Sequence, residues 1–209
     1  MLGNDEMVTI LKRHDLFSNV VSTHPAVPNG MDPPEHTAYR RIVEKYFEPP
    51  HIEEFEAGCR ALAESRWGSL ERGRSLEIME SFAHPYALDT QCAFVGWPVS
   101  MREPLSRWLG ANQQATREQN RERLVELAAE FQTMVEEQMK LRRLRDPKLQ
   151  GTDVTTRLMS ESIDGRTLNS NEITSILRNW TVGELATMAA SAGILAGFLA
   201  QDPSLQSHL

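Results

Sequence analysis

Apolar side chains recur every three or four residues along most of this chain, and this spacing constrains the fold more than any other feature. The pattern is clearest in the charged segment 117–145. Its apolar positions are Leu124, Leu127, Ala128, Phe131, Val135 and Met139, which lie on one side of a helix. Nowhere do apolar and polar residues alternate long enough to build a large sheet. The sequence therefore predicts a mainly α fold.

Proline, glycine and acidic residues mark where the expected helices begin and end. The expected helices cover residues 5–13, 32–47, 52–71, 81–94, 101–110, 117–145, 153–161 and 170–198, with a short terminal helix after Asp202-Pro203. A loop rich in proline and glycine spans residues 19–34, and Asp164-Gly165 predicts a turn. Residues 75–79 are predicted to be a short strand or an extended segment.

The composition and charge of the chain indicate which kinds of protein it can be. Its 209 residues are 40% hydrophobic and 24% charged, as expected for a globular domain with a core. A net charge of −7 argues against nucleic acid as a partner of the whole chain. No basic, apolar leader opens the chain, and the longest uncharged stretch, residues 185–200, is shorter than a bilayer span. We interpret that stretch as a core helix, and we expect a soluble, cytoplasmic protein with no membrane partner.

The sequence contains none of the generic catalytic signatures. It has no phosphate-binding glycine loop, no pair of histidines on a helix with a glutamate between them, and no nucleophile elbow. Its two cysteines, Cys59 and Cys92, have no cysteine or histidine at metal-ligand spacing, so we interpret them as buried thiols. The tripeptide that begins at Asn179 matches a glycosylation acceptor, which we interpret as a chance match within a helix.

The segment after Pro33 carries a candidate binding pair. His36 and Arg40 are four residues apart, so they project from the same face of the predicted helix. Two neighbouring donor groups suit a ligand with a pair of carboxylates. The alternative is a solvated helix face on which Glu44 lies nearby.

This segment, Asp32-Pro33-Pro34-Glu35-His36-Thr37-Ala38-Tyr39-Arg40-Arg41, closely resembles the start of the C helix in bacterial cytochromes P-450, the haem-thiolate monooxygenases. Further segments resemble family motifs in the family's order, namely residues 16–18, 151–159, 164–173, 181–187 and 198–203. The resemblance implies the helical part of the cytochrome P-450 fold, without its N-terminal strands and its C-terminal haem-ligand loop. It divides the chain into the B helix and B–C loop (1–31), the C and D helices (32–73), the E to H region (74–168), the I helix (169–201) and the start of the J helix (202–209).

The resemblance also implies a cofactor, partners and residue roles. In the complete protein, His36 and Arg40 would hold the propionates of haem, and Gly183 on the I helix would leave space for dioxygen. The substrate would be a small apolar molecule that contacts residues 18–29, 108–130 and 177–190. A ferredoxin- or flavodoxin-type protein would supply electrons.

The predicted I helix departs from the family pattern of an acid and an alcohol that relay protons to bound oxygen. Leu185 and Ala186 occupy those two positions, and Glu184 and Thr187 flank them, each displaced by one residue. One reading is a displaced relay through Glu184 and Thr187, aided by a local π-type bulge. The other is structural, with Thr187 bonding back to the Gly183 carbonyl and Glu184 solvated or ion-paired.

The axial ligand of the family is missing from this chain. That cysteine lies in a Phe-x-x-Gly-x-x-x-Cys-x-Gly loop after the I helix, and both Cys59 and Cys92 precede the I-helix motif. We therefore expect a fragment of a haem-dependent monooxygenase that is inactive on its own and binds no haem tightly. The alternative is a non-catalytic helical binding module derived from a truncated cytochrome P-450.

Overall fold

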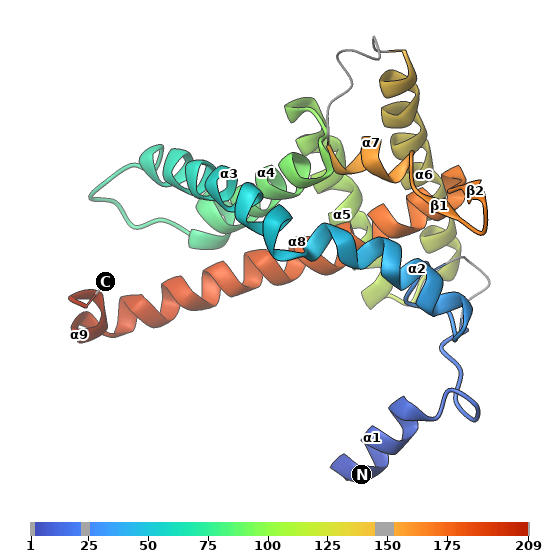
Figure 1. Cartoon of the computed structure of the whole chain (residues 1–209). Helices are drawn as coiled ribbons and strands as arrows, with labels where there is room; N and C mark the ends of the chain where they lie inside the picture. Colours follow the sequence, from blue (N-terminus) through green and yellow to red (C-terminus); the bar gives the residue numbers. More distant parts are fainter. Residues whose placement is uncertain (1–2, 22–25, 145–152, 209) are drawn as a thin grey trace.

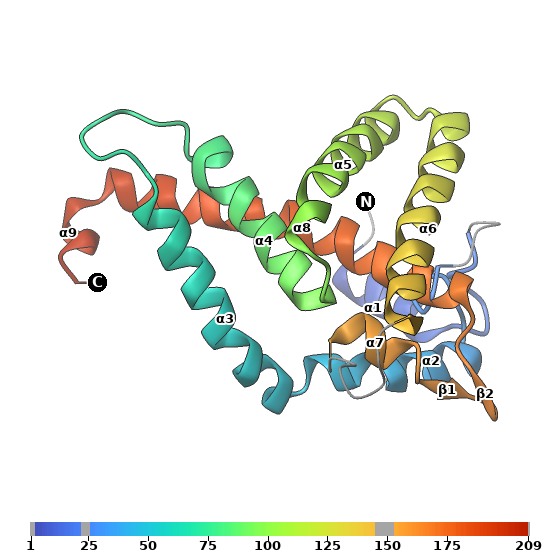
Figure 2. The ribbon, with the colours of Figure 1, turned by 90° about the horizontal axis from the view of Figure 1, so that it is seen from above.

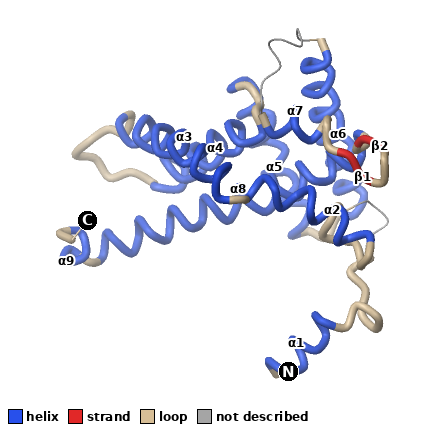
Figure 3. The backbone as a smooth tube through the Cα atoms, in the orientation of Figure 1, coloured by secondary structure: helices blue, strands red, loops and turns tan. Residues whose placement is uncertain are grey.

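Helices dominate the structure, as the apolar spacing predicts (Figure 3). This computed structural model describes residues 3–21, 26–144 and 153–208. The α-helices are α1 (Asn4–Lys12), α2 (Glu35–Glu44), α3 (Pro49–Gly68), α4 (His84–Val95), α5 (Arg102–Arg117), α6 (Arg121–Arg143), α7 (Val154–Leu158), α8 (Ser170–Gln201) and α9 (Pro203–Gln206). Short 3-10 turns, Lys45–Phe47 and Val99–Met101, follow α2 and precede α5, and a π-helical turn, Met79–Ala83, leads into α4.

The two short strands form a hairpin beside α7. Strands β1 (Ser162–Ile163) and β2 (Arg166–Thr167) are antiparallel, with Ser162 opposite Thr167. The turn between them is the predicted Asp164-Gly165 pair, and both residues have positive φ. The sequence therefore located the turn correctly, although it did not predict the strands.

Helix α8 runs along the whole body of the molecule and organises the core (Figures 1 and 2). A capping box starts it: the Asn169 side chain accepts from the Glu172 backbone N–H, and the Glu172 carboxylate accepts from the Asn169 N–H. Helices α4 and α6 and the π-turn pack against it. Its first half supplies fully buried side chains, Ile173, Ile176 and Leu177.

The second half of α8 is far less covered. Ile194, Leu195 and Phe198 are 71%, 62% and 61% exposed. The interpretation of residues 185–200 as a core helix is therefore right for Leu185 and Ala189, holds in part for Ala192, and is wrong for Ile194, Leu195 and Phe198. Among the described residues, α8 is the one helix long and apolar enough to cross a membrane, judged by length and composition alone.

Helices α3, α4 and α5 are tied together by one buried carboxylate. Asp89 of α4, 3% exposed, accepts a hydrogen bond from Arg66 Nε of α3 at 2.5 Å and pairs with Arg102 of α5. A buried carboxylate needs such compensation, because desolvation otherwise penalises its charge. This network ties the last turns of α3 and the start of α5 to the middle of α4.

The end of α4 depends on a glycine. Gly96 has φ of +74°, which favours a residue without a side chain, and an added Cβ would collide with Asp153. Its carbonyl accepts a hydrogen bond from Arg142 Nη2 at 2.6 Å, and Arg142 also pairs with Asp153. Gly96 thus brings the ends of α4, α6 and α7 together.

Helix α1 lies apart from the body of the molecule (Figure 1) and buries no side chain. It ends at Lys12, close to the predicted boundary. The loop that follows is tied near its start by Asp32, whose carboxylate accepts from Ser18 Oγ at 2.5 Å and from the Asn19 N–H at 2.9 Å.

Several predicted boundaries are wrong for identifiable reasons. Helix α3 begins at Pro49, because prolines that stop one helix are favoured in the first turn of the next. Residues 75–77 form neither strand nor helix, and residues 78–79 are already helical. Helix α5 continues through Gly110 to Arg117, since Leu105, Trp108 and Ala115 are buried on its inner face. The predicted end of the long charged helix at residues 145–147 and the motif residues 151–152 lie outside the described residues.

Candidate functional site

Helix α2 presents His36 and Arg40 because its opposite face is anchored in the core. Tyr39, Ile42 and Val43 are buried. The Tyr39 hydroxyl donates to Glu172 Oε1 at 2.5 Å, which joins α2 to the first turn of α8. Burial raises the pKa of Glu172, but hydrogen bonds from Arg166, Tyr39 and the Asn169 N–H outweigh it and hold the pKa at about 2. The carboxylate is therefore charged at neutral pH and locks α2 onto α8.

The structure brings Arg40, but not His36, to a hollow shared with α8. Arg40 is about half exposed and donates from Nε to Glu44 at 2.7 Å. It lines a hollow of about 250 Å³ together with Phe47, Asn179 and Trp180. His36 lies one turn earlier on α2 and is partly exposed, and its imidazole makes no hydrogen bond to any residue that the structure describes.

The loop before α2 is pinned to α8 at the same hollow. The Val27 N–H donates to Ser175 Oγ at 2.8 Å, and Asn179 Nδ2 donates to the Val27 carbonyl at 3.0 Å. Asn179 therefore holds the loop, a role that sequence reasoning missed. The four-residue spacing of Ser175, Asn179 and Gly183 along one helix face is the signal that could have found it.

Gly183 lies on an open part of α8, one turn after Asn179. A Cβ placed on it would meet nothing within 4 Å. The Thr187 hydroxyl donates to the Gly183 carbonyl at 2.6 Å and to the Glu184 carbonyl at 3.2 Å. This hydrogen bond to the preceding turn is the one expected if Thr187 has only a structural role. It uses the hydroxyl hydrogen, which is then not free for another acceptor.

Glu184 is partly buried without a partner. Its carboxyl makes no hydrogen bond or ion pair within residues 3–21, 26–144 and 153–208. Burial raises its pKa to about 7, so the group holds its proton over much of the neutral range. Among the described residues, Glu184 therefore has no ion pair of the kind that the structural interpretation includes.

Leu185 and Ala186, which the resemblance puts at the relay positions, point toward α4 and α5 and not toward the open side of α8. Leu185 is 2% exposed, and Leu185 and Ala186 line a hollow of about 200 Å³ with Glu80, His84 and part of α5. Helix α8 is α-helical throughout, and the π-turn lies instead at Met79–Ala83, packed against α8. The expected bulge within the I-helix motif is therefore absent from the described α8.

Neither cysteine is suited to bind a metal. Burial raises the pKa of Cys59, and it raises the pKa of Cys92 to about 11, so both stay as thiols at neutral pH. No cluster of three or more histidine, cysteine or acidic side chains able to hold a metal ion occurs in the described parts of the chain.

The arrangement of helices has close counterparts among solved structures. Cytochrome P-450 PksS of the Bacillus subtilis bacillaene polyketide synthase superposes with a TM-score of 0.75 at 25% identity, covering 88% of this chain and 48% of that one. The LnmZ cytochrome P-450 hydroxylase of the leinamycin pathway of Streptomyces atroolivaceus gives a TM-score of 0.71 at 25% identity, covering 87% and 49%. The fold is therefore the helical part of the cytochrome P-450 fold.

Sequence comparison agrees with the fold. A probable cytochrome P-450 127A1 of Sinorhizobium fredii is 24% identical over 207 residues, which is 98% of this chain and 48% of the relative. The chain is a relative of the bacterial cytochromes P-450. The erythromycin C-12 hydroxylase of Saccharopolyspora erythraea is 28% identical over 72% of this chain and 38% of its own length. No family model matches the chain. The chain spans about half the length or less of these two cytochromes P-450.

The residues present fit part of a haem site. Arg40 is a carboxylate-binding side chain at the rim of a hollow on α8, and α8 has open space at Gly183. Haem offers two carboxylates and a flat face, which match these two features. The described residues supply no thiolate to bind its iron.

Proposed function

We propose that this chain forms part of a haem-dependent monooxygenase that oxidises a small apolar substrate. The observation that carries the proposal is the position of Arg40 beside the open stretch of α8, in a chain related to bacterial cytochromes P-450. When bound, haem supplies the oxygen-activating iron. Cys92 is buried and Cys59 is partly exposed, and both have a raised pKa, so neither supplies a thiolate at neutral pH. The chain therefore needs a thiolate from elsewhere and is inactive on its own.

The helices map onto the family in chain order. We assign α1 to the B helix, α2 to the C helix and α3 to the D helix, and we assign α4 to α7 to the E to H region. Helix α8 is then the I helix, and α9 is the start of the J helix. This mapping puts the loop held by Asn179 where family members contact substrate.

Arg40 and His36 bind the two propionates in this proposal. The Arg40 guanidinium exchanges its exposed Glu44 partner for a propionate, which costs little because an exposed ion pair contributes at most about 1 kcal/mol. His36 lies one turn away on the same face, and Gly183 keeps the helix surface free of side-chain atoms where oxygen binds.

The Glu184 carboxyl moves the proton. Its pKa of about 7 allows it to give up and regain a proton near neutral pH, whereas the Thr187 hydroxyl is already bonded to the Gly183 carbonyl. In the working enzyme, a ferredoxin- or flavodoxin-type protein delivers the electrons.

A spectrum of the purified chain tests the need for an outside thiolate. After addition of haem, dithionite and carbon monoxide, we expect none of the thiolate-type absorption that gives the family its name. A strong thiolate-type band that disappears in Cys59→Ser or Cys92→Ser would overturn this part of the proposal. The genomic reading frame past Leu209 should continue to a Phe-x-x-Gly-x-x-x-Cys motif.

Haem retention tests the roles of Arg40 and His36. In an enzyme assembled from this chain and a thiolate-bearing partner segment, Arg40→Ala should lower haem occupancy. Arg60→Ala is the matched control, because Arg60 forms a similarly exposed pair with Glu56 on α3. Unchanged occupancy in both Arg40→Ala and His36→Ala would refute the assignment.

Product yield tests the proton role of Glu184. In the same enzyme, Glu184→Gln should lower the yield per reduced nicotinamide and increase peroxide release, while Thr187→Ala should change both less. If neither substitution alters the yield, protons reach oxygen by another route.

A further inference from the structure

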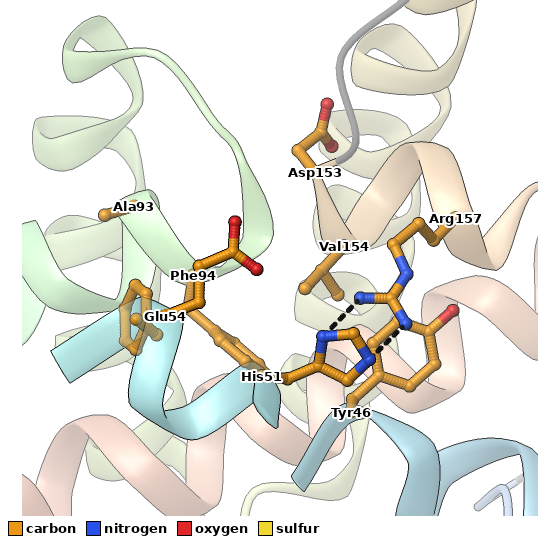
Figure 4. Close-up of a pocket in the computed structure, with 9 residues that line it drawn as sticks. Tyr46, His51, Glu54, Ala93, Phe94, Asp153, Val154 and Arg157 are labelled. Carbon is orange, nitrogen blue, oxygen red and sulfur yellow. Dashed lines mark hydrogen bonds between the residues drawn. The ribbon is translucent and has the colours of Figure 1, made fainter. Parts of the chain in front are cut away.

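A second hollow lies away from Arg40 and Gly183. It measures about 680 Å³ and lies between the first turns of α3, the end of α4 and α7 (Figure 4). No residue lines both this hollow and the one beside Arg40. Its volume is within the range typical of small-molecule sites.

One wall of the hollow carries a cation with incomplete compensation. The Arg157 guanidinium lies 4.6 Å from the centroid of the Tyr46 ring and contacts both ring nitrogens of His51, at 3.0 and 3.4 Å. No carboxylate within the described parts of the chain pairs with Arg157. The 3-10 turn Lys45–Phe47 and helix α3 therefore both contact this guanidinium without neutralising it.

The contact with His51 cannot satisfy the guanidinium. A neutral imidazole has one acceptor nitrogen, and its other nitrogen carries a hydrogen. At most one of the two contacts is therefore a hydrogen bond, and the remaining guanidinium donors have no acceptor among the residues that the structure describes. A carboxylate is the group that matches a planar guanidinium best, since it accepts two parallel hydrogen bonds.

The adjoining wall is aromatic. Phe55 and Phe94 meet edge to face with centroids 5.5 Å apart, and Phe94 joins a cluster with Phe47 and Trp180. Such a surface favours a flat apolar body, because aromatic pairs add to the gain from burial. A ligand that fills the hollow therefore combines one acidic group with an aromatic ring.

The hollow is also lined by two carboxylates, Glu54 and Asp153, which affect the net charge that a bound ligand can have. Figure 4 shows the Glu54 carboxylate on the opposite side of the hollow from the Arg157 guanidinium. Asp153 is already engaged by Arg142 and by the Thr156 hydroxyl. Nearby negative charge disfavours a dianion such as phosphate more than a monoanion. From these contacts we propose that the hollow binds a small aromatic monocarboxylate, whose carboxylate pairs with Arg157 and whose ring packs on Phe55 and Phe94.

Titration calorimetry on the purified chain with 3-phenylpropanoate tests this site. We expect 3-phenylpropanoate to bind at least about tenfold more tightly than the neutral 3-phenylpropanamide, since a charge-assisted pair is lost in the amide. Inorganic phosphate should not bind. Equal binding of acid and amide, or no binding of the acid, would overturn the proposal without depending on any variant.

Substitutions then test whether the acid binds in this hollow. Arg157→Gln and Phe55→Ala should each weaken binding of the acid by at least about tenfold, and Arg60→Gln on the exposed face of α3 should leave it unchanged. Glu54→Gln should tighten binding, because it removes an opposing negative charge. Circular dichroism verifies that each variant is folded. A folded Arg157→Gln variant with unchanged affinity would show that the acid binds elsewhere.

Discussion

The two halves of α8 differ in a way that their composition does not suggest: the second half, 186–201, has no charged residue, yet it is the more exposed of the two. Leu177 in the first half is fully buried, and Leu195 in the second is 62% exposed. The difference comes from the neighbours, because α4 and α6 cover the first half and leave much of the second uncovered. Hydropathy along one helix therefore does not reveal which part of it belongs to the core.

Matched truncations of leucine give the strongest test of this comparison. Leu177→Ala should lower the free energy of unfolding of the purified chain by about 3 kcal/mol, because it leaves a cavity in a packed core. Leu195→Ala should change it by less than about 0.5 kcal/mol. Urea unfolding followed by circular dichroism measures both. Similar losses at the two positions would mean that the second half is also covered in solution.

The Glu172 carboxylate, in the first half of α8, should contribute to the stability of the chain in a pH-dependent way. Its pKa falls from the ordinary 4.5 to about 2 on folding, so its contribution is complete above pH 4.5 and is lost as the pH falls toward 2. Glu172→Gln should cost about 2 kcal/mol at pH 7 and much less near pH 2. Glu130→Gln, which alters an exposed pair with Arg123, is the control and should change little. A pH-independent loss in Glu172→Gln would rule out this linkage.

Glu184 lies near the junction of the two halves and should have the opposite pH dependence. Its pKa rises from 4.5 to about 7 on folding, so the chain loses stability as the pH rises from about 4.5 through 7. Glu184→Gln removes the charge, so the variant should be more stable than the parent by about 1 kcal/mol at pH 8 and nearly equal at pH 4.5. Unfolding at the two pH values measures this. An unchanged difference across that range would place the pKa of Glu184 near its ordinary value.

Two glycine-to-alanine substitutions on α8 should have the smallest effects on stability and should differ from each other. Gly183→Ala should stabilise the purified chain by about 0.5–1 kcal/mol, because alanine favours the helix and its Cβ meets nothing within 4 Å. Gly193→Ala should gain less or destabilise, since its Cβ would collide with Met79 of the π-turn. Thermal unfolding compares the two. Equal gains would indicate that the π-turn does not cover α8 at Gly193.

Local patterns in the sequence predicted the features that depend on residues close together in the chain. The three- and four-residue apolar spacing predicted the helical class, and Asp164-Gly165 predicted the turn of the hairpin. The resemblance of residues 32–41 to a C-helix start predicted the family, which the sequence comparison bears out. The roles of His36, Arg40, Gly183, Glu184 and Thr187 toward haem and oxygen remain predictions.

Features that depend on distant residues could not be predicted in this way. Asn179 was interpreted as a chance match, yet it holds Val27, which lies 152 positions away in the chain. Residues 75–79 were expected to form a short strand or an extended segment. No strand forms, because the segment has no partner strand among the described residues, and its last two residues already lead into the π-turn that packs on α8. In both cases the outcome depends on what packs nearby, and local propensity carries no information on that.

The sequence by itself determined the helical class, most helix ends and the common face of His36 and Arg40, because these follow from spacing and capping within a few residues. Only the tertiary structure decided which half of α8 is covered, that Glu184 is desolvated, and that Arg157 meets His51 across 106 positions of the chain. Burial and charge compensation arise when separate helices pack together. They belong to the assembled core, and no single segment encodes them.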